Sequence, residues 1–213
     1  MPDIKFYFAP GACSLASHIL LRETGVDFEA IAMRVNETRV TFPADFALIN
    51  PKMRVPVITL DQNTITEVPA IATVIASLAP NIHLMGRTPL DAARVYEWMN
   101  WLSGTLHGGG FGHLFRPQRF SDDPAAFDGI KAKAFECIKD CFDSIEEKLV
   151  GVYAVGGALT AVDPYLFVFY RWGNEAGFEM KKKYTKYTAL VSNLAQRTAV
   201  KATLDAENIR STL

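Results

Sequence analysis

The residue best suited to chemistry in this sequence is a lone cysteine near its start. Cys13 follows the apolar run IKFYF and the turn residues Pro10 and Gly11, at the point where CSLASHILLRE predicts that a helix begins. There, unpaired backbone N–H groups and the positive end of the helix dipole favour a thiolate over a thiol. We therefore expect a nucleophilic sulfur, or one that binds another sulfur. The alternative is a small buried side chain, because free cysteine is among the most buried residue types.

The chain has no partner thiol at the spacing that redox enzymes use. Thioredoxin-type enzymes carry C-x-x-C, in which the second thiol resolves a mixed disulfide. Here the residue three positions after Cys13 is Ala16, so the redox partner must come from outside the chain. Cys137 and Cys141 are four residues apart on an amphipathic pattern, and we interpret them as packing residues.

Two further stretches could bind a ligand. In INPKMRVPVITL, Pro56 opens a strand, a position where cis prolines occur although trans is commoner, and a cis bond would leave the Val55 backbone free to pair with an extended ligand. In TITEVPAIA, Glu67 and Val68 lie between a strand and a helix opened by Pro69, where backbone N–H groups suit a carboxylate. Glu67 taken alone could be an ordinary first-turn acid.

The secondary-structure pattern changes part-way along the chain. Up to residue 80 it reads βαβ and then αββα, with strands expected at 4–8, 28–33, 55–60 and 64–66 and helices at 13–24, 42–49 and 70–79. Later spacing is helical, with helices expected at 87–106, 125–150, 161–176 and 188–207. We therefore expect an α/β domain at 1–80, a linker rich in turn residues at 81–89 and an all-helical domain at 90–213.

One motif of the helical half has a purely structural interpretation. Thr160 and Asp163 have the spacing of a capping box ahead of the apolar helix DPYLFVFY. Such a cap fixes where a buried helix begins, and its loss costs about 1 to 2 kcal/mol.

The composition excludes several classes of partner. The 213 residues contain 22 Lys and Arg against 23 Asp and Glu, a net charge of -1, which gives no field that attracts nucleic acid or an anionic membrane. The start MPDIKFYFAPG does not resemble a signal peptide, and no stretch reaches the ~18 apolar residues of a membrane span. Three cysteines without metal-type spacing are typical of a reducing cytosol. We expect a soluble, cytoplasmic protein that needs no metal.

Four motifs together resemble one family. PGACSLASHILLRETG, INPKMRVP, the TE-x-x-AI pattern of TEVPAIA, and TAVDPYL occur in the order and spacing of the cytosolic glutathione transferases, and the cysteine after PGA is similar to the bacterial beta class. The resemblance covers nearly the whole chain. It implies a thioredoxin-like N-terminal domain (βαβαββα) that binds glutathione, an all-helical C-terminal domain that binds an electrophile, and a homodimer.

The resemblance also implies roles for individual residues. The Val55–Pro56 bond would be cis, with Val55 pairing with the cysteinyl backbone of glutathione, while Glu67 and the Val68 N–H would hold its γ-glutamyl end. Cys13 would lie at the sulfur of the tripeptide. The segment NWLSGTLH is similar to the beta-class helix whose Asn and His reach the same site, and seven residues separate the two on one helical face. These two residues are Asn100 and His107; the acceptor pocket would be lined by Phe111, Phe115, Tyr165 and Trp172.

Three departures from the family pattern affect the expected glutathione contacts. The serine that usually follows the acid is Val68, so only a backbone donor is left there. The beta-class lysine aligns with Thr38, and whether the adjacent Arg39 replaces it is open. The segment GGGFGHLFRP after His107 is rich in glycine, which predicts a mobile or closely packed segment near the acceptor pocket.

Three functions are compatible with these features. The leading hypothesis is a glutathione transferase that conjugates glutathione, as co-substrate, to electrophilic and largely apolar small molecules, with Cys13 and His107 stabilising the thiolate. The second is thiol transfer or peroxide reduction through a mixed disulfide on Cys13. The third is a non-catalytic binding protein of the same fold, which the weakened contacts at Thr38 and Val68 keep open.

Overall fold

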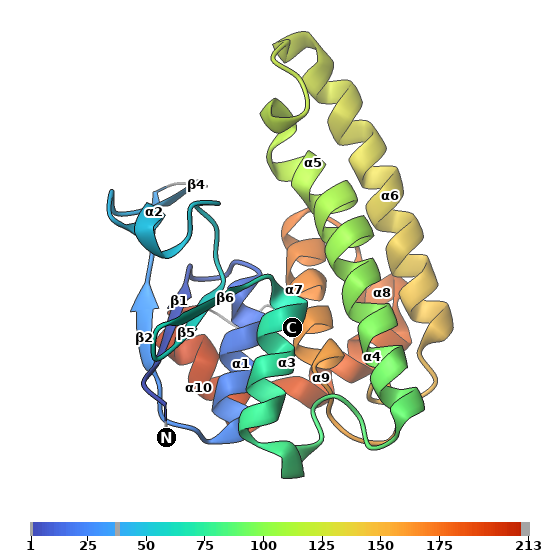
Figure 1. The fold of residues 1–213 in the computed structure, drawn as a ribbon. Helices are drawn as coiled ribbons and strands as arrows, with labels where there is room; N and C mark the ends of the chain where they lie inside the picture. Colours follow the sequence, from blue (N-terminus) through green and yellow to red (C-terminus); the bar gives the residue numbers. More distant parts are fainter. Residues whose placement is uncertain (1, 37–38, 210–213) are drawn as a thin grey trace.

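The computed structural model describes residues 2–36 and 39–209. Its first part is a sheet in the order β2-β1-β5-β6, formed by β1 (Ile4–Phe8), β2 (Glu29–Ala32), β5 (Val57–Leu60) and β6 (Asn63–Thr66). β2 is parallel to β1, and the other neighbours are antiparallel. The helices of this part are α1 (Ser14–Thr24), α2 (Phe46–Ile49) and α3 (Val68–Leu78). This is the expected thioredoxin-like arrangement (Figure 1).

Alternation along β1 explains how the sheet is covered on both faces. Phe6 and Phe8 point to one side, where they join the main core together with the apolar residues of α1 and α3. Tyr7 points to the other side, where its ring meets Phe46 of α2 in a small second cluster. The sheet is therefore a middle layer, and the C-terminal end of β1 leads directly into the loop that carries Cys13.

The connection between β2 and α2 contains a hairpin that was not predicted. β3 (Arg34–Asn36) pairs antiparallel with β4 (Arg39–Thr41), and Val35 lies opposite Val40. Each strand is only three residues long, too short to produce the period-two pattern by which strands are recognised. The expectation for Thr38 concerns a residue outside those that the structure describes, and the side chain of Arg39 is likewise not described.

The chain after residue 78 is helical. The helices are α4 (Pro89–Trp101), α5 (His113–Phe115), α6 (Phe127–Lys148), α7 (Val162–Glu175), α8 (Met180–Lys183), α9 (Thr185–Ala195) and α10 (Thr198–Ala206). α7 is buried along most of its length, and α1 packs against both α7 and α10, so the two halves share one core. No described helix has the length and apolar content needed to cross a bilayer.

The helix expected at 188–207 is in fact two helices. Between α9 and α10, Arg197 has an extended backbone (φ -69°, ψ 138°). Its guanidinium bonds the carboxylate of Glu23 on α1 in a bidentate manner, with Nη2 2.7 Å from Oε2. A contact with a residue so distant in sequence stabilises the break, which local helical spacing cannot reveal.

The helix expected at 87–106 changes type part-way. After α4 the chain continues as a π-helix, η2 (Leu102–Gly112), whose hydrogen bonds span five residues. A Cβ at Gly110 would lie 2.7 Å from Cγ1 of Ile138 on α6, so only glycine permits this approach. The glycine-rich segment is therefore closely packed at this point. In Figure 1 the run α4–η2–α5 rises beside α6.

The predicted Thr160–Asp163 cap forms in part. The Asp163 carboxylate accepts from the Thr160 N–H at 2.7 Å and from the Thr160 hydroxyl at 3.1 Å, and its other oxygen accepts from the Ala154 N–H at 2.7 Å. The hydroxyl of Thr160 thus donates to the acid and does not cap the helix N–H. A complete capping box occurs instead at the start of α4, between Thr88 and Asp91. Burial raises the pKa of Asp163 to about 6.

We expect Asp163→Ala to lower the free energy of unfolding by about 2 kcal/mol, because the buried Thr160 N–H and the half-buried Ala154 N–H lose their acceptor. This corresponds to a melting temperature roughly 4–8 °C lower for a chain of this size. Asp163→Asn keeps an oxygen acceptor and removes a charge that burial disfavours, so its loss should be about half as large. Thermal unfolding followed by circular dichroism measures whether Asp163→Ala is less stable than Asp163→Asn. Equal losses of stability in the two variants would contradict this prediction.

Candidate functional site

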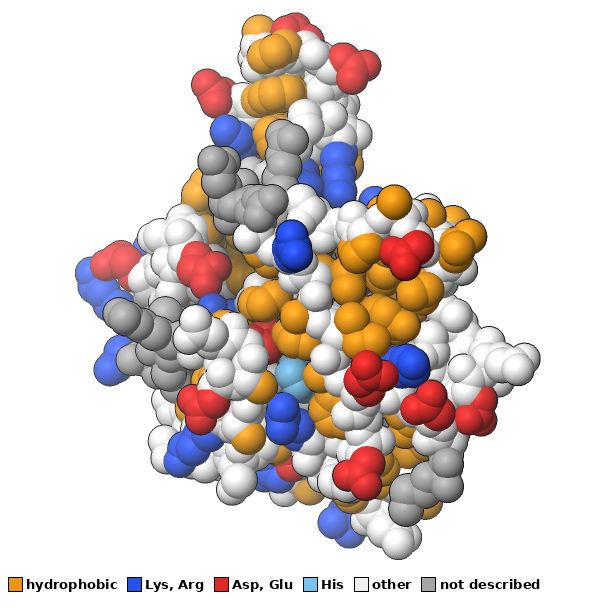
Figure 2. Space-filling view, turned by 90° about the vertical axis from the view of Figure 1, so that its left-hand side faces the viewer, with side chains coloured by type: hydrophobic (Ala, Val, Ile, Leu, Met, Phe, Trp, Pro, Cys, Tyr) orange, Lys and Arg blue, Asp and Glu red, His pale blue; other side chains and the backbone are white. Residues whose placement is uncertain are grey.

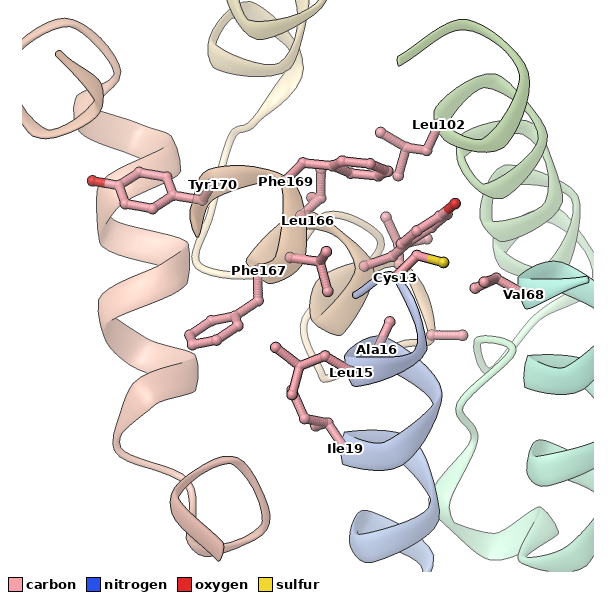
Figure 3. Packing of buried hydrophobic residues seen from close by; sticks show 14 of the residues in the cluster. Cys13, Leu15, Ala16, Ile19, Val68, Leu102, Leu166, Phe167, Phe169 and Tyr170 are labelled. Atoms are coloured by element: carbon pink, nitrogen blue, oxygen red, sulfur yellow. The ribbon is translucent and has the colours of Figure 1, made fainter. Parts of the chain in front are cut away.

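Cys13 lies at the N-cap of α1, where the sequence predicts it. Before it, Gly11 turns the chain with a φ of 72°, a left-handed value that glycine adopts without steric cost. Ser14 stabilises the turn, because its hydroxyl accepts from the Ala9 N–H at 3.2 Å and donates to the Ala9 carbonyl at 3.1 Å. Figure 3 shows the sulfur directed toward Val68 at the start of α3.

Residues far along the chain also hold this loop, and sequence reasoning missed them. The buried carboxylate of Glu207, just after α10, accepts from the Gly11 N–H at 2.9 Å and lies 2.8 Å from Nδ1 of His18. Trp172 of α7 donates its indole N–H to the Gly11 carbonyl at 2.9 Å. The helical half of the chain therefore bonds both backbone groups of Gly11. No motif in the sequence distinguishes Glu207 from an exposed acidic residue.

Cys13 borders a cleft of about 930 Å³ between the loops of the sheet and the π-helix. Of the residues singled out in the sequence, those that line it are Cys13, Val55, His107, Phe111, Phe115 and Trp172. Those that do not are Pro56, Glu67, Val68, Asn100 and Tyr165. Figure 2, which views the molecule from the side that carries α2, shows apolar side chains gathered in the middle of this face with charged side chains around them. Apolar walls with a few polar groups are usual for small-molecule sites.

The surroundings of Cys13 favour the thiol over the thiolate that a helix start by itself would favour. Burial raises the pKa of this thiol to about 12. The hydrogen bonds from its own N–H and that of Ser14, and the positive charge of Arg116, act in the opposite direction but are smaller. Cys13 is only 8% exposed, so the loss of water around its sulfur outweighs the effect of the helix N-terminus. At neutral pH Cys13 is therefore an S–H group that can donate a hydrogen bond.

The Val55–Pro56 peptide bond is cis, as the resemblance implies. The Val55 carbonyl lies 3.5 Å from the Cys13 sulfur and accepts its hydrogen bond. Pro56 is buried immediately before β5. The backbone of Val55 and the thiol thus face the same part of the cleft.

Glu67 occupies the N-cap of α3 with a left-handed φ of 71°, which is uncommon for a residue with a side chain. Its exposed carboxylate pairs with Lys52, whose ammonium also donates to the Thr66 hydroxyl at 2.6 Å. Sequence reasoning did not single out Lys52. Val68 is buried, so only its backbone N–H is available to a ligand. The negative charge of Glu67 is near enough to Cys13 to contribute to its raised pKa, after burial.

His107 lies in the π-helix with its ring against Phe169 and Trp172. Burial lowers the pKa of His107 to about 4, and the positive charges of Arg116 and Arg54 lower it further. The imidazole is therefore neutral at pH 7. Its Nδ1 lies 3.3 Å from the hydroxyl of Tyr165. With Tyr165 donating to Nδ1, the single ring proton resides on Nε2.

Two of the predicted site residues are not among those that line the cleft. Asn100 is exposed on α4, before the π-helix that carries His107. Tyr165 is fully buried and does not line the acceptor cleft. Its hydroxyl contacts His107 and lies 3.3 Å from the Ser103 hydroxyl, so it orients the imidazole instead.

The lowered pKa of His107 makes a testable contribution to stability. In the unfolded chain, a histidine with a pKa near 6.5 binds a proton as the pH falls below that value. In the folded protein His107 binds it only near pH 4, so the free energy of unfolding decreases as the pH falls from about 6.5 to 4. Asp163 acts oppositely, because its folded pKa is raised. Comparing wild type with His107→Phe cancels the contribution of Asp163, which both share. Between pH 7 and pH 5 the free energy of unfolding, measured with urea, should fall by about 1 to 2 kcal/mol more in wild type than in His107→Phe. Equal losses would contradict burial of a neutral imidazole.

Comparison with known proteins defines the family. Residues 11–78 match the family described as glutathione S-transferase, N-terminal domain. Over 212 residues the chain is 31% identical to glutathione S-transferase GstA of Escherichia coli O157:H7, covering 97% of this chain and 100% of that relative. The chain belongs to the glutathione S-transferase family. This membership confirms both the resemblance and the enzyme class, a glutathione transferase.

Solved glutathione S-transferases have the same fold. A sphingomonad glutathione S-transferase complexed with glutathione is 36% identical with a TM-score of 0.83, covering 97% of this chain and 100% of that one. The bacterial beta-class glutathione S-transferase of Sphingomonas chungbukensis is 33% identical with a TM-score of 0.83, again over 97% and 100%. The expected fold, a thioredoxin-like domain followed by helices, is confirmed.

Proposed function

We propose that this glutathione transferase conjugates glutathione to electrophilic, largely apolar small molecules and thereby serves in detoxification. The observation that carries the proposal is the cleft itself, in which Cys13, Val55 and His107 meet from three separate segments beside the rings of Phe111 and Trp172. The glutathione in the sphingomonad complex supports the same co-substrate here.

The γ-glutamyl end of glutathione is held at the start of α3. The Glu67 carboxylate binds the ammonium group, and the Val68 N–H, at the positive end of a helix, binds the carboxylate. The cysteinyl backbone pairs with Val55. Asn100, exposed on α4, remains a proposed glutathione contact; like Glu67 and Val68, it is not among the residues that line the cleft.

The reacting sulfur lies between two neutral hydrogen-bond donors. When glutathione is bound, its cysteinyl N–H takes the Val55 carbonyl, and the Cys13 S–H turns from that carbonyl to the glutathione thiolate. The His107 Nε2–H donates to the same thiolate, and a hydrogen bond to a charged group favours that charged form. The thiol proton of glutathione goes to solvent. The thiolate attacks the electrophilic carbon, so a C–S bond forms while the bond to the leaving group breaks and that group departs with the electron pair. Phe111, Phe115 and Trp172 flank the acceptor.

Conjugation of glutathione to 1-chloro-2,4-dinitrobenzene, together with retention on immobilised glutathione, tests the proposal. We expect both. Absence of both would refute it, whereas tight glutathione binding in calorimetry without conjugation would favour the non-catalytic binding protein. Boiled protein and Glu97→Gln, which changes an exposed acid on α4 paired with Arg94, are the controls.

The mixed-disulfide alternative is disfavoured by the raised pKa of Cys13, because the thiolate is the nucleophile in disulfide exchange. Cys13→Ala should therefore lower conjugation by less than about tenfold, the loss of one hydrogen bond. After incubation with oxidised glutathione, mass measurement of wild type should show no adduct on Cys13. A glutathione-sized adduct that reductant removes, with thiol transfer abolished in Cys13→Ala, would establish the alternative.

A homodimer and a cytoplasmic location are part of the same proposal. Leu90 and Tyr96 of α4 are 66% and 41% exposed, apolar surface available to a second copy. All three cysteines are free, as in a reducing compartment. Light scattering in solution measures the oligomeric state.

A further inference from the structure

The cleft carries positive charges that the proposed conjugation does not use. Arg54, Arg116, Arg119 and Lys131 all line it. Among residues 2–36 and 39–209, no carboxylate forms an ion pair with any of the four. The acid among the described lining residues, Glu175, is bonded to Arg171 at 3.0 Å. The cleft therefore has an excess of positive charge, although the whole chain is nearly neutral.

These cations converge from separate segments of the chain. Arg54 directly precedes the cis Val55–Pro56 bond. Arg116 follows α5, and its backbone N–H donates to the Gly112 carbonyl. Arg119 ends a short 3-10 helix, and Lys131 lies on α6. The three arginines are close enough to influence one another: burial lowers the pKa of Arg119, and the charges of Arg116 and Arg54 lower it further. Like charges gathered in a cleft without partners repel, and a bound anion removes that repulsion.

The walls beside the cations are aromatic. Phe111 and Phe115 are in contact, with ring centroids 5.4 Å apart, and both face Trp172 at 5.2 and 5.7 Å. Phe42, from the loop after β4, lines the same cleft. A flat ring packs well against such walls, since offset and edge-on aromatic contacts are favourable. An acceptor that matches both features has an aromatic body and a negative group.

We propose that the acceptor part of the cleft selects aromatic electrophiles that carry a carboxylate, which Arg116, Arg119 and Lys131 bind. The inference rests on the proposed conjugation and names its substrate class. Glutathione also has carboxylates, so the alternative is that the same cations bind the glycyl carboxylate of glutathione. The chemical step is unchanged: the glutathione sulfur forms the C–S bond, and chloride leaves the ring with the C–Cl electron pair.

The test compares 4-chloro-3-nitrobenzoate with 4-chloro-3-nitrobenzamide, which share ring and leaving group and differ in charge. For each, kcat/KM is divided by the uncatalysed rate with glutathione, which corrects for intrinsic reactivity. Wild type should prefer the benzoate by about tenfold, the effect of a charge-assisted hydrogen bond. The preference should shrink as salt is raised from about 0.05 to 0.5 M, because salt screens partly exposed charges. No preference would overturn the proposal.

Matched variants show whether these cations cause the preference for the benzoate. Arg119→Gln combined with Lys131→Gln should abolish the preference and leave the KM for glutathione unchanged, and Arg119→Glu should favour the amide. Lys133→Gln, an exposed lysine on the same helix paired with Glu136, should change neither. If the double variant instead raises the KM for glutathione equally with both electrophiles, the cations hold glutathione and the proposal is wrong.

Failure of the conjugation itself is distinguishable from failure of this inference. If neither electrophile reacts, the proposed function fails. Calorimetry can still measure how tightly the benzoate and the amide bind to the acceptor part of the cleft when the unreactive S-methylglutathione is bound beside it. Tighter binding of the benzoate than of the amide, lost in the double variant, would support the anion subsite. Equal binding of the two would overturn it.

Discussion

Glu207→Ala is expected to lower the free energy of unfolding by about 3 kcal/mol, because two donors, the buried ring N–H of His18 and the Gly11 N–H, lose their acceptor. The carboxylate is inaccessible to solvent and bonds both His18 on α1 and the Gly11 N–H in the Cys13 loop. Arg22 donates to the other ring nitrogen of His18 at 3.3 Å, so Nδ1 carries the ring proton and donates it to Glu207. Urea unfolding monitored by tryptophan fluorescence measures the loss.

Two variants show whether the loss arises from this network. Asp205→Ala removes an exposed acid two residues earlier on α10 and should change stability by less than about 0.5 kcal/mol. Glu207→Gln keeps one acceptor oxygen and should lose less than Glu207→Ala. Because the network holds the loop before Cys13, the Ala variant should also bind glutathione more weakly when measured well below its melting temperature. A stability loss within 0.5 kcal/mol of Asp205→Ala, roughly the usual surface effect, would contradict this account.

Glu67→Gln is expected to weaken glutathione binding by about 10- to 100-fold, the usual contribution of a hydrogen bond between charged groups. In the proposed complex this carboxylate holds the γ-glutamyl ammonium, and the backbone of Glu67 keeps an uncommon left-handed conformation that presents it at the start of α3. Stability should change little, because its pair with Lys52 is exposed. Calorimetric titration with glutathione measures the effect.

The matched control is Lys52→Met, which breaks the same ion pair from the other side. If the pair itself mattered, both variants would weaken binding alike. We expect Lys52→Met to stay within about threefold of wild type, because an exposed pair contributes little. A dissociation constant for Glu67→Gln within twofold of wild type would show that the γ-glutamyl end is held elsewhere.

Local signals in the sequence predict much of this molecule. The alternation in IKFYF predicts β1, Pro10 and Gly11 predict the turn, and the apolar spacing after Cys13 predicts α1, all as observed. The hairpin β3–β4 was missed because three-residue strands carry no periodic signal. The π-helix was missed because helical spacing alone does not distinguish it from an α-helix, and it is Gly110 against Ile138 that permits the close packing there.

The chemistry of the site divides in the same way. The sequence by itself determined which groups are present: a single thiol at a helix start, a proline after Val55, an acid at the start of α3, and His107 downstream. Only the tertiary structure decided their protonation and their partners. Burial depends on neighbours from distant segments, and it is burial that makes both Cys13 and His107 neutral. The same long-range packing places Glu207 on the Cys13 loop and gathers four cations in one cleft, contacts that no local pattern encodes.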